Sequence, residues 1–429
     1  EALMRLSDAA LLQQCDRSVR LVEEFFWTLW PGFFWVAGGA FGMLNLLLTK
    51  WYDGDYPGVF QDLITGIPNT ALVKETHDLW HLADELRHSP ELLACMKHQD
   101  AAFFRALEDS ERGRAFLEKY RQFLTRHGHR GHQDRDIYYV RRCEDPALDY
   151  RAFKALLAAG ESRRPEEIET ELQKRREAAT AAVSANLTAQ PLGGLKAELF
   201  KMMLAYIHRI LKFRDDERHF LDRQTLQKKR SFAELGRRMR ERGLLEGADD
   251  FYFLARHELY ELFAGRASQR LCRAKIEARR RVFHRRNARQ EQTPPFMQAG
   301  KPINLEHANS ETATVGGLQG MGTSRGEATG LARVLRNIED IGRLQKDNIL
   351  VCNSTDPGWM PVFPLIKGLV LETGGMLAHG ACLSREYGLP AVQLRNAIQL
   401  IEDGALIHVN GDTGEIRVLS SMAEELETA

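Results

Sequence analysis

The sequence has no excess of either charge and no closely spaced cysteines. Among its 429 residues, 59 lysines and arginines balance 59 aspartates and glutamates, so the formal net charge is zero. Because a neutral chain has no general field that attracts nucleic acid or anionic lipid, we predict no nucleic-acid partner. The six cysteines are far apart and form no CxxC pair. This usage predicts reduced thiols in a cytoplasmic protein, with no metal site in this chain.

No secretory signal is expected, because no charged segment followed by a cleavage site opens the chain. The chain begins with Glu1, which we interpret as a piece of a longer protein. One uncharged run, residues 25–49, is long enough to cross a bilayer. Pro31-Gly32 and Gly38-Gly39 interrupt this run, and no basic cluster flanks it. We therefore expect a broken pair of buried helices, with aromatic side chains lining a core or an apolar pocket, and no membrane span.

Residues 1–295 predict a mostly α-helical domain. Apolar residues recur there at three- and four-residue spacing, for example in residues 72–87, 101–127 and 230–245. The charged run 163–187 has few large apolar residues and is expected to be a solvated arm or a long exposed helix. Thr293-Pro294-Pro295 ends the helical pattern, and residues 296–314 read as a linker.

Residues 315–421 change pattern and predict a compact α/β domain. Short β-branched or apolar runs are bounded by Gly, Asp and Pro, and they lie at 330–335, 347–353, 368–373, 391–394, 405–410 and 415–419. Helical segments are expected between them, at 338–345 and 384–388. Residues 422–429 remain as a tail. The predicted fold class is therefore multidomain, with a helical domain followed by an α/β domain.

One cluster, residues 372–391, combines a glycine turn with a histidine that could act as a nucleophile. A strand ends there in Gly374-Gly375, which allow a tight turn, and His379 follows where a helix is expected to begin. Free N–H groups at a helix start favour a phosphate, and neutral imidazole is a nucleophile near neutral pH. From these residues alone, His379 is either a phosphoryl acceptor or a structural residue. Arg385, two turns on, is either a phosphate contact or a surface residue.

Three motifs in order decide between these alternatives: GTSRG at 322–326, TDPGWMP at 355–361, and the cluster around His379. With them, residues 317–419 resemble the swivelling phosphohistidine domain of the PEP-utilising enzyme family. The resemblance implies that His379 carries a phosphoryl group. Ala378 departs from the family, which usually has Ser or Cys there, and this removes a possible hydrogen bond to the imidazole. Leu377 replaces a Thr of some dikinases, which argues against regulation by phosphorylation at that place.

Upstream, LITGIPNT at 63–70, HGHRG at 127–131 and the segment 243–254 carry a second resemblance. They resemble the substrate-binding middle region of the rifampicin phosphotransferase group, which includes ATP-dependent enzymes acting on phenols and other lipophilic metabolites. The resemblance implies that the helical domain holds an acceptor in an apolar pocket. The aromatic residues that we predict to line it, with plain core as the alternative, are Trp27, Trp30, Phe34 and Trp35.

Arg214 and Arg218 are four residues apart and so share one helix face. Two guanidinium groups on one face could clamp a phosphoryl group during its transfer, and the alternative is a surface ladder with Asp215 and Glu217. Given the resemblance, we predict both arginines as catalytic residues beside His379.

A loop rich in titratable groups follows the glycines near residue 130. It contributes four predicted substrate-binding residues: His129, His132, Asp134 and Asp136. A His or Asp there could accept the proton of an acceptor hydroxyl. Rifampicin enzymes tend to carry Glu-Ile-Asp where this chain has Asp134-Arg135-Asp136, which leaves the acceptor's identity open.

The family's phosphate-donor module is not found in this sequence. No glycine-rich ATP-binding pattern appears upstream, and few residues follow Leu419. We therefore expect ATP and Mg²⁺ to bind a separate domain or subunit, and the chain alone to be inactive.

The resemblance implies a dikinase-type phosphotransferase. The β-phosphoryl of ATP would pass through phospho-His379 to a hydroxyl of a small lipophilic aromatic acceptor, such as a rifamycin-like antibiotic or a phenol. Two alternatives remain: a ligase that activates a small molecule for condensation, as in pyrrole-pigment assembly, and a non-enzymatic phosphate relay.

Overall fold

The computed structural model describes residues 3–160, 164–289, 297–298, 301–302, 317–376 and 378–420. The chain divides into two compact units. Unit 1 consists of Glu1–Phe33, Asp134–Val140 and Phe220–Asn304, and unit 2 of Phe34–Gln133, Arg141–His219 and Leu305–Ala429. Most of the predicted linker 296–314, Leu377 and the whole of the predicted tail 422–429 lie outside the described residues. The domain boundaries at 295 and 315 remain a prediction.

The described residues before 290 are mostly helical, as predicted. The helices are α1 (Asp8–Glu24), α2 (Trp30–Trp51), α3 (Tyr56–Leu63), α4 (Ala71–His88), α5 (Pro90–Cys95), α6 (Ala101–Ala106), α7 (Glu111–His127), α8 (Ala147–Ala158), α9 (Pro165–Thr188), α10 (Gly193–Glu241), α11 (Arg256–Phe263) and α12 (Gln269–Arg289). Short 3₁₀ turns lie at Leu3–Arg5, Leu107–Asp109 and Ala248–Phe253.

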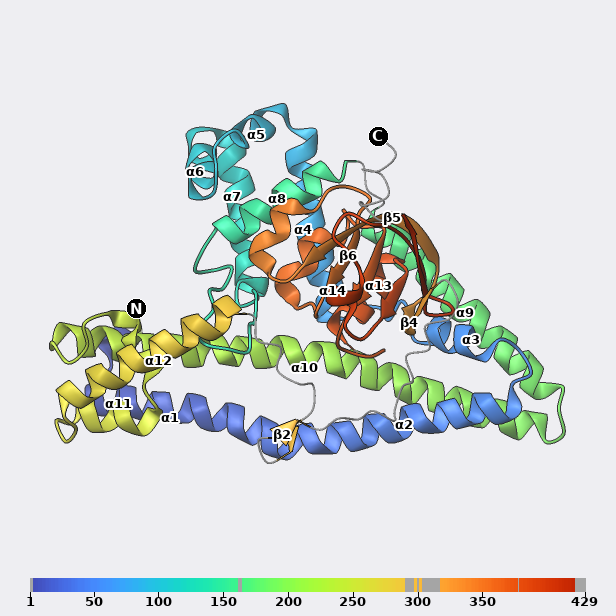
Figure 1. Cartoon of the computed structure of the whole chain (residues 1–429), viewed down its shortest axis with the longest axis horizontal. Helices are drawn as coiled ribbons and strands as arrows, with labels where there is room; N and C mark the ends of the chain where they lie inside the picture. The colour runs from blue at the N-terminus through green and yellow to red at the C-terminus, as the bar shows by residue number, and fades with distance from the viewer. Residues whose placement is uncertain are drawn as a thin grey trace. The chain divides into compact units, whose positions relative to one another are not determined.

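Unit 1 packs α1, the last part of α10, α11 and α12 around one apolar core (Figure 1). Ser7 begins α1, because its hydroxyl accepts a hydrogen bond from the N–H of Ala10 at 3.3 Å. The core is built from Leu11 and Cys15 of α1 together with Leu235, Met239, Leu259, Leu262, Cys272 and Ile276.

The uncharged run forms one continuous helical stretch, so the expected broken pair of buried helices is wrong. A π-helical turn, Phe25–Leu29, joins α1 to α2, and the N–H of Trp30 reaches back to the carbonyl of Phe25. Such a turn accommodates Pro31, which has no N–H to donate and would disrupt a regular α-helix. Trp27 and Trp35 are 82% and 83% exposed, so they line no core.

The stretch Asp8–Trp51 passes a test of length and composition for a membrane span. Of its most apolar 18 residues, 29% are buried within the structure. A single helix of this kind near the N-terminus is weak evidence for a span.

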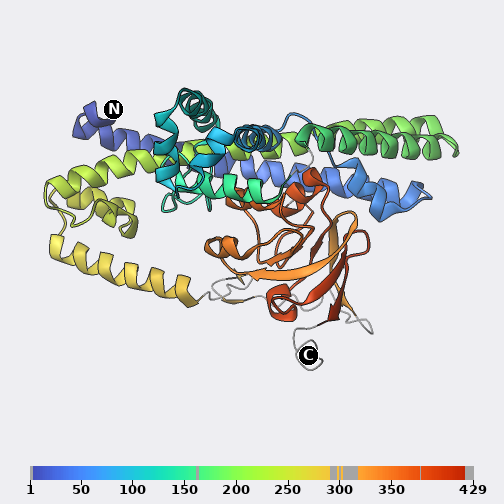
Figure 2. The ribbon, with the colours of Figure 1, turned by 90° about the horizontal axis from the view of Figure 1, so that it is seen from above.

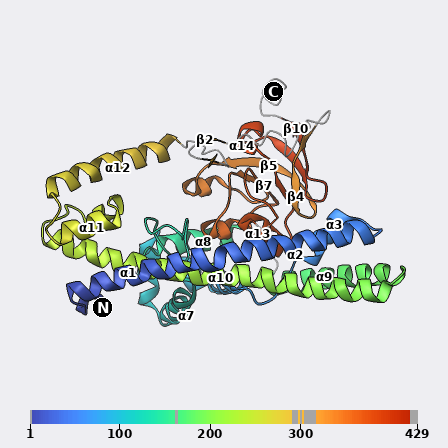
Figure 3. The same cartoon turned by 90° about the horizontal axis from the view of Figure 1, so that it is seen from below.

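The helical part of unit 2 packs α4, α6, α7 and α8 around apolar residues that include Phe103 of α6, Phe116 of α7 and Phe153 of α8. Helix α9 covers the run that was expected to be a solvated arm, and Figure 3 shows it alongside the first part of α10. Leu172, Val183 and Leu187 of α9 are buried. The run is therefore helical, as one of the two expectations had it, but one of its faces packs against the protein.

An eight-stranded sheet forms the C-terminal domain. Six of its strands overlap the predicted runs, whereas the first two, at Leu318–Gln319 and Met321–Ser324, were not predicted. The strands are β3 (Leu318–Gln319), β4 (Met321–Ser324), β5 (Glu327–Leu335), β6 (Ile349–Cys352), β7 (Gly368–Leu371), β8 (Ala391–Gln393), β9 (Leu406–Asn410) and β10 (Glu415–Ser420). A separate pair, β1 (Met297–Gln298) and β2 (Lys301–Pro302), is antiparallel. The predicted succession of a helical and an α/β domain is confirmed.

The sheet order is β3-β10-β9-β5-β6-β7-β8-β4, and β5 to β8 are parallel. Strands β6 and β7 are wholly buried, as continuous apolar runs in a parallel sheet require. Only Gly320 separates β3 from β4, yet these strands lie at opposite ends of the order. The sheet must therefore curl round on itself.

The helices α13 (His379–Tyr387) and α14 (Ala397–Leu400) and the 3₁₀ turns Ile338–Arg343 and Pro357–Val362 complete this domain. One apolar core runs from Phe103 and Phe116 of the helical part to Leu369 and Leu383 of the sheet domain. Figure 2 shows the sheet domain, in orange and red, against the helices of unit 2. The two parts of unit 2 are thus docked together in this structure.

Candidate active site

His379 is the first residue of α13, at the end of the loop that follows β7. The loop turns at Gly374, whose φ of +143° favours glycine, and a Cβ there would lie 2.7 Å from the Cβ of Ala378. Ala378 precedes the helix in an extended conformation and gives no side-chain cap. The first N–H groups of α13 therefore receive no bond from this position, as an anion-binding helix start requires.

Arg385 is buried and fixes the loop before His379, so it is not a surface residue. Its guanidinium donates to the carbonyl of Met376 at 2.7 Å and to that of Thr323 at 2.8 Å. These bonds tie the His379 loop to β4.

Arg214 reaches the first turn of the helix that begins with His379. Its Nη1 donates to the Sγ of Cys382 at 3.0 Å and to the Oδ1 of Asp215 at 2.9 Å. Burial raises the pKa of Asp215 although the positive charge of Arg214 opposes this. Arg218 lies one turn further along α10 and is half-buried. The structure therefore brings Arg214 to the helix of His379, a contact that was not predicted, and the catalytic roles of Arg214 and Arg218 stay predictions.

The loop that contains His129 and His132 packs against the TDPGW turn, residues 355–359, of the sheet domain. His132 Nδ1 lies 2.7 Å from Asp356 Oδ2, and the N–H of Gln133 donates to the same oxygen at 3.1 Å. A Cβ on Gly358 would lie 3.0 Å from the Cα of His132, so the approach requires glycine. His132 is therefore held beside the segment that precedes the 3₁₀ turn Pro357–Val362.

His129 lies in a group of histidine rings. Its ring centroid is 4.3 Å from that of His219, which follows Arg218 on α10, and His127 lies 5.9 Å from the same ring. His127 Nε2 is 2.8 Å from Asp78 Oδ2. His129 thus lies close to the arginine-bearing part of α10.

The remaining predicted substrate residues are not gathered around His379 within unit 2. Trp27, Trp30, Asp134 and Asp136 belong to unit 1, where the Arg135 guanidinium covers the Trp30 ring at 5.3 Å. Asp136 accepts a hydrogen bond from the N–H of Tyr138 at 2.9 Å, and Asp134 is fully buried. Trp35 belongs to unit 2 but is largely exposed, and the side chain of Phe34 lies outside the described residues.

A pocket of about 720 Å³ opens beside the His379 loop, and the sequence did not reveal its lining. Gly375 and Met376 of the loop form one wall, and the rest comes from α2, α3 and the sheet domain: Phe41, Gly42, Asn45, Tyr56, Phe60, Gln61, Gly320, Met321, Gly322, Asp412 and Thr413. The Phe41 and Tyr56 rings lie 6.2 Å and 6.4 Å from the Phe60 ring. We call this the loop pocket.

Gln61 anchors the loop pocket to the sheet domain. Its Nε2 donates to the carbonyls of Gly322 at 3.3 Å and Gly411 at 3.4 Å. Its Oε1 is buried and has no hydrogen-bond partner among the described residues. The pocket therefore combines aromatic walls with an amide group, as small-molecule sites commonly do.

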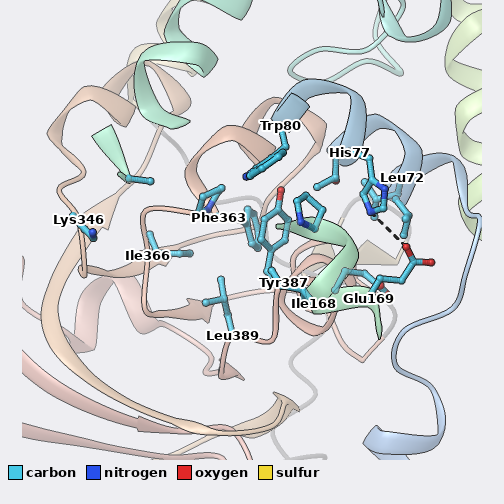
Figure 4. A pocket seen from close by; sticks show the side chains of 16 residues that line it. Leu72, His77, Trp80, Ile168, Glu169, Lys346, Phe363, Ile366, Tyr387 and Leu389 are labelled. Atoms are coloured by element: carbon cyan, nitrogen blue, oxygen red, sulfur yellow. Dashed lines mark ion pairs between the residues drawn. The ribbon is translucent and has the colours of Figure 1, made fainter. Parts of the chain in front are cut away.

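A second pocket, of about 250 Å³, lies at the other end of α13 (Figure 4). The rings of Trp80, Phe363 and Tyr387 line it, and His77 Nε2 lies 3.5 Å from Glu169 Oε2 at its edge. Since Tyr387 is the last residue of α13 and His379 the first, this pocket is a helix length away from the histidine.

Glu386 in the second pocket has an unusual acidity. Burial, together with the negative charges of Asp215 and Glu169, raises its pKa to about 8, against the opposing charges of Arg385 and Arg176. A carboxyl with a raised pKa keeps its proton in the folded state over a pH range where the unfolded chain loses it. The free energy of unfolding is thus expected to fall as pH rises from the ordinary glutamate value towards 8.

Glu386→Gln is expected to remove this pH dependence, because the amide stays neutral at every pH. Melting temperatures measured across this range should fall less in the variant than in the wild type, and the variant should be the more stable protein above pH 8. Glu402→Gln, which removes an exposed carboxylate of the same domain, should behave like the wild type. Parallel curves for wild type and Glu386→Gln would contradict the raised pKa.

A helical region followed by a sheet domain with a histidine at a helix start is the arrangement expected of one class of protein, the phosphotransferases of the PEP-utilising kind. Comparison with known families agrees with this class. Residues 32–215 match the rifampicin phosphotransferase fourth domain, and residues 344–414, which include His379, match the mobile domain of PEP-utilising enzymes. The chain thus carries regions that match both of these families, and it is similar to rifampicin phosphotransferases and related phosphotransferases.

Its relatives are longer proteins. A rifampicin phosphotransferase of Bacillus cereus is 30% identical over 80% of this chain and 39% of its own length. The uncharacterized phosphotransferase YvkC of Bacillus subtilis is 27% identical over 88% of this chain and 46% of its own length. The prodigiosin synthesizing transferase PigC of Serratia marcescens is 27% identical over 94% of this chain and 45% of its own length. The chain thus spans less than half the length of these curated relatives.

Proposed function

We propose that this chain is the acceptor-binding and phosphohistidine part of an ATP-dependent phosphotransferase. An ATP-binding domain or subunit supplies ATP and Mg²⁺. His379 attacks the β-phosphorus, an N–P bond forms, and the bond from that phosphorus to the AMP oxygen breaks, so that AMP leaves. Water then cleaves the γ-phosphate from the pyrophosphoryl group on the histidine, phosphate leaves, and phospho-His379 remains. The observation that carries the proposal is the position of His379 at the start of α13, between Met376, which lines the loop pocket, and Cys382, which Arg214 contacts, along the chain.

The loop pocket is the proposed acceptor site. An acceptor hydroxyl attacks the phosphorus of phospho-His379, the N–P bond breaks, and the hydroxyl proton passes to a base, for which His129 and His132 remain the predicted residues. The aromatic walls favour an apolar, aromatic acceptor such as a phenol or a rifamycin-like antibiotic. The second pocket is too far along α13 to present an acceptor to His379.

A pulse–chase experiment tests this proposal. The chain is labelled with an ATP-binding module and ATP carrying label at the β-phosphate, freed of nucleotide, and mixed with candidate phenols and rifamycins. Appearance of the label on an acceptor supports the proposal. A stable label that no hydroxyl compound discharges would support the phosphate relay instead.

Phe41→Ala is expected to slow discharge to aromatic acceptors about tenfold, because the variant loses one aromatic wall of the loop pocket. Labelling of His379 should be unchanged, since Phe41 belongs to the acceptor side. Met43→Ala is the matched control, because Met43 lies on the same helix, is 56% exposed and does not line the pocket. Equal discharge rates in the Phe41 and Met43 variants would argue against the loop pocket as the acceptor site.

The similarity to PigC, which covers 94% of this chain, favours a second candidate, a ligase. In that reaction the phosphorylated molecule reacts with a second substrate and releases phosphate. Label that appears as free phosphate only when two substrates are present would support the ligase over the simple phosphotransferase.

A further inference from the structure

Thr355 carries a buried hydroxyl that the described structure leaves unused. Thr355 lies between β6 and the 3₁₀ turn Pro357–Val362, and its Oγ1 has no hydrogen-bond partner among the described residues. A buried polar group without a partner lowers stability, so its presence calls for a functional explanation.

The hydroxyl faces the first turn of α13. A Cβ on Gly380 would lie only 2.6 Å from Thr355 Oγ1, so the hydroxyl rests directly against the backbone of the residue after His379. Only glycine at position 380 allows this approach. The neighbouring cap residue, Ala378, has no hydroxyl of its own to offer.

The turn that carries Thr355 is held rigidly. The next residue, Asp356, accepts a hydrogen bond from the N–H of Gly358 at 2.9 Å and lies 2.7 Å from His132 Nδ1. A donor on a fixed turn can bind an oxyanion without first losing conformational freedom.

We propose that Thr355 is a phosphoryl-binding residue, whose hydroxyl donates a hydrogen bond to the phosphoryl group on His379. This inference rests on the proposed function. A phosphoryl group brings three strong acceptor oxygens and a negative charge to the start of α13. The hydroxyl then gains the partner that it lacks in the unphosphorylated protein, so the contact favours the phosphorylated state.

The test uses the purified chain and phosphoramidate as a chemical donor, so that no ATP-binding module is needed. The imidazole nitrogen forms an N–P bond, and ammonia leaves. Mass spectrometry of the His379 peptide measures the label, and ³¹P resonance follows its hydrolysis. In Thr355→Val, which removes only the hydroxyl, phospho-His379 is expected to hydrolyse about tenfold faster.

Three further variants separate binding from folding. Thr355→Ser keeps the hydroxyl and should match the wild type. Thr373→Val removes an exposed hydroxyl of the loop that precedes His379, which is bound to Asn353, and should also match it. Ala378→Ser in the Thr355→Val background should restore the slow hydrolysis. The melting temperature of Thr355→Val should be unchanged or raised, because the variant loses an unpartnered polar group.

The outcomes distinguish the two proposals. Normal label on His379 with unchanged hydrolysis and ³¹P shift in Thr355→Val overturns the role of Thr355 alone. No label on His379 of the folded wild type overturns the proposed function, and this inference with it. If Thr355→Val and Thr355→Ser both melt at a lower temperature than the wild type, Thr355 is a structural residue.

Discussion

His379→Ala is expected to abolish acid-labile, base-stable labelling of the chain by ATP labelled at the β-phosphate in the presence of an ATP-binding module. The variant has no nucleophile at the start of α13, and no neighbouring group replaces a missing covalent acceptor. The loss should be complete within detection, and transfer to every acceptor should stop with it. Since His379 is the first residue of α13 and the apolar core beneath that helix is formed by other residues, such as Leu383, folding should persist.

The control is His408→Ala, which removes another histidine of the same domain. His408 lies on β9 and its Nδ1 is 3.0 Å from Thr329 Oγ1, in a part of the sheet that does not line the loop pocket. This variant should label like the wild type. Equal labelling of the His379 variant would mean that another residue accepts the phosphoryl group, and the reading of α13 would be wrong.

Six strands of the sheet domain could be predicted because each is a short apolar run between turn residues. Strands β6 and β7 are continuous four-residue apolar stretches, and both strands are buried. In a parallel sheet covered on both faces, every residue of a strand is buried, so a continuous apolar run in the sequence is sufficient to predict the strand.

Helix α2 could not be predicted in the same way. Pro31 and several glycines indicated a break, but a single π-helical turn lets the chain remain helical. A Cβ at Gly38, Gly39 or Gly42 would meet nothing within 4 Å, so no close packing requires these glycines. Their helix-breaking tendency costs about 1 kcal/mol each, which neighbouring helical residues can offset.

The loop pocket could not be predicted from the sequence because its lining residues are far apart along the chain. Gln61 and the carbonyls that it contacts are 261 and 350 residues apart along the chain. No periodicity relates positions at such separations, and only docking of the sheet domain on α2 and α3 brings them together. The motif around His379 was visible because its residues are neighbours in sequence, whereas Gln61 and Phe60 have no local signal.

Arg214→Ala is expected to slow transfer from phospho-His379 to an acceptor by roughly 10²- to 10³-fold, the loss typical of one preorganised group that stabilises developing charge. The guanidinium reaches the first turn of α13 at Cys382, where it can contact a phosphoryl group in flight. Chemical labelling of His379 should persist. Arg209→Ala, an exposed arginine on the same helix, should transfer at the normal rate.

A structural role for Arg214 makes a different prediction, and Cys382→Ala separates the two. If Arg214 only holds α13 in place through the Cys382 sulfur, then removing that sulfur should slow transfer as much as removing the guanidinium. If Arg214 stabilises the phosphoryl group, Cys382→Ala leaves the charge in position and should cost little. Arg214→Lys, which keeps the charge without the planar fork, should fall between wild type and Arg214→Ala. Because Arg218 lies one turn along the same face, Arg218→Ala should slow transfer as well. If Arg214→Ala and Arg218→Ala both transfer at the wild-type rate, other residues stabilise the charge of the phosphoryl group.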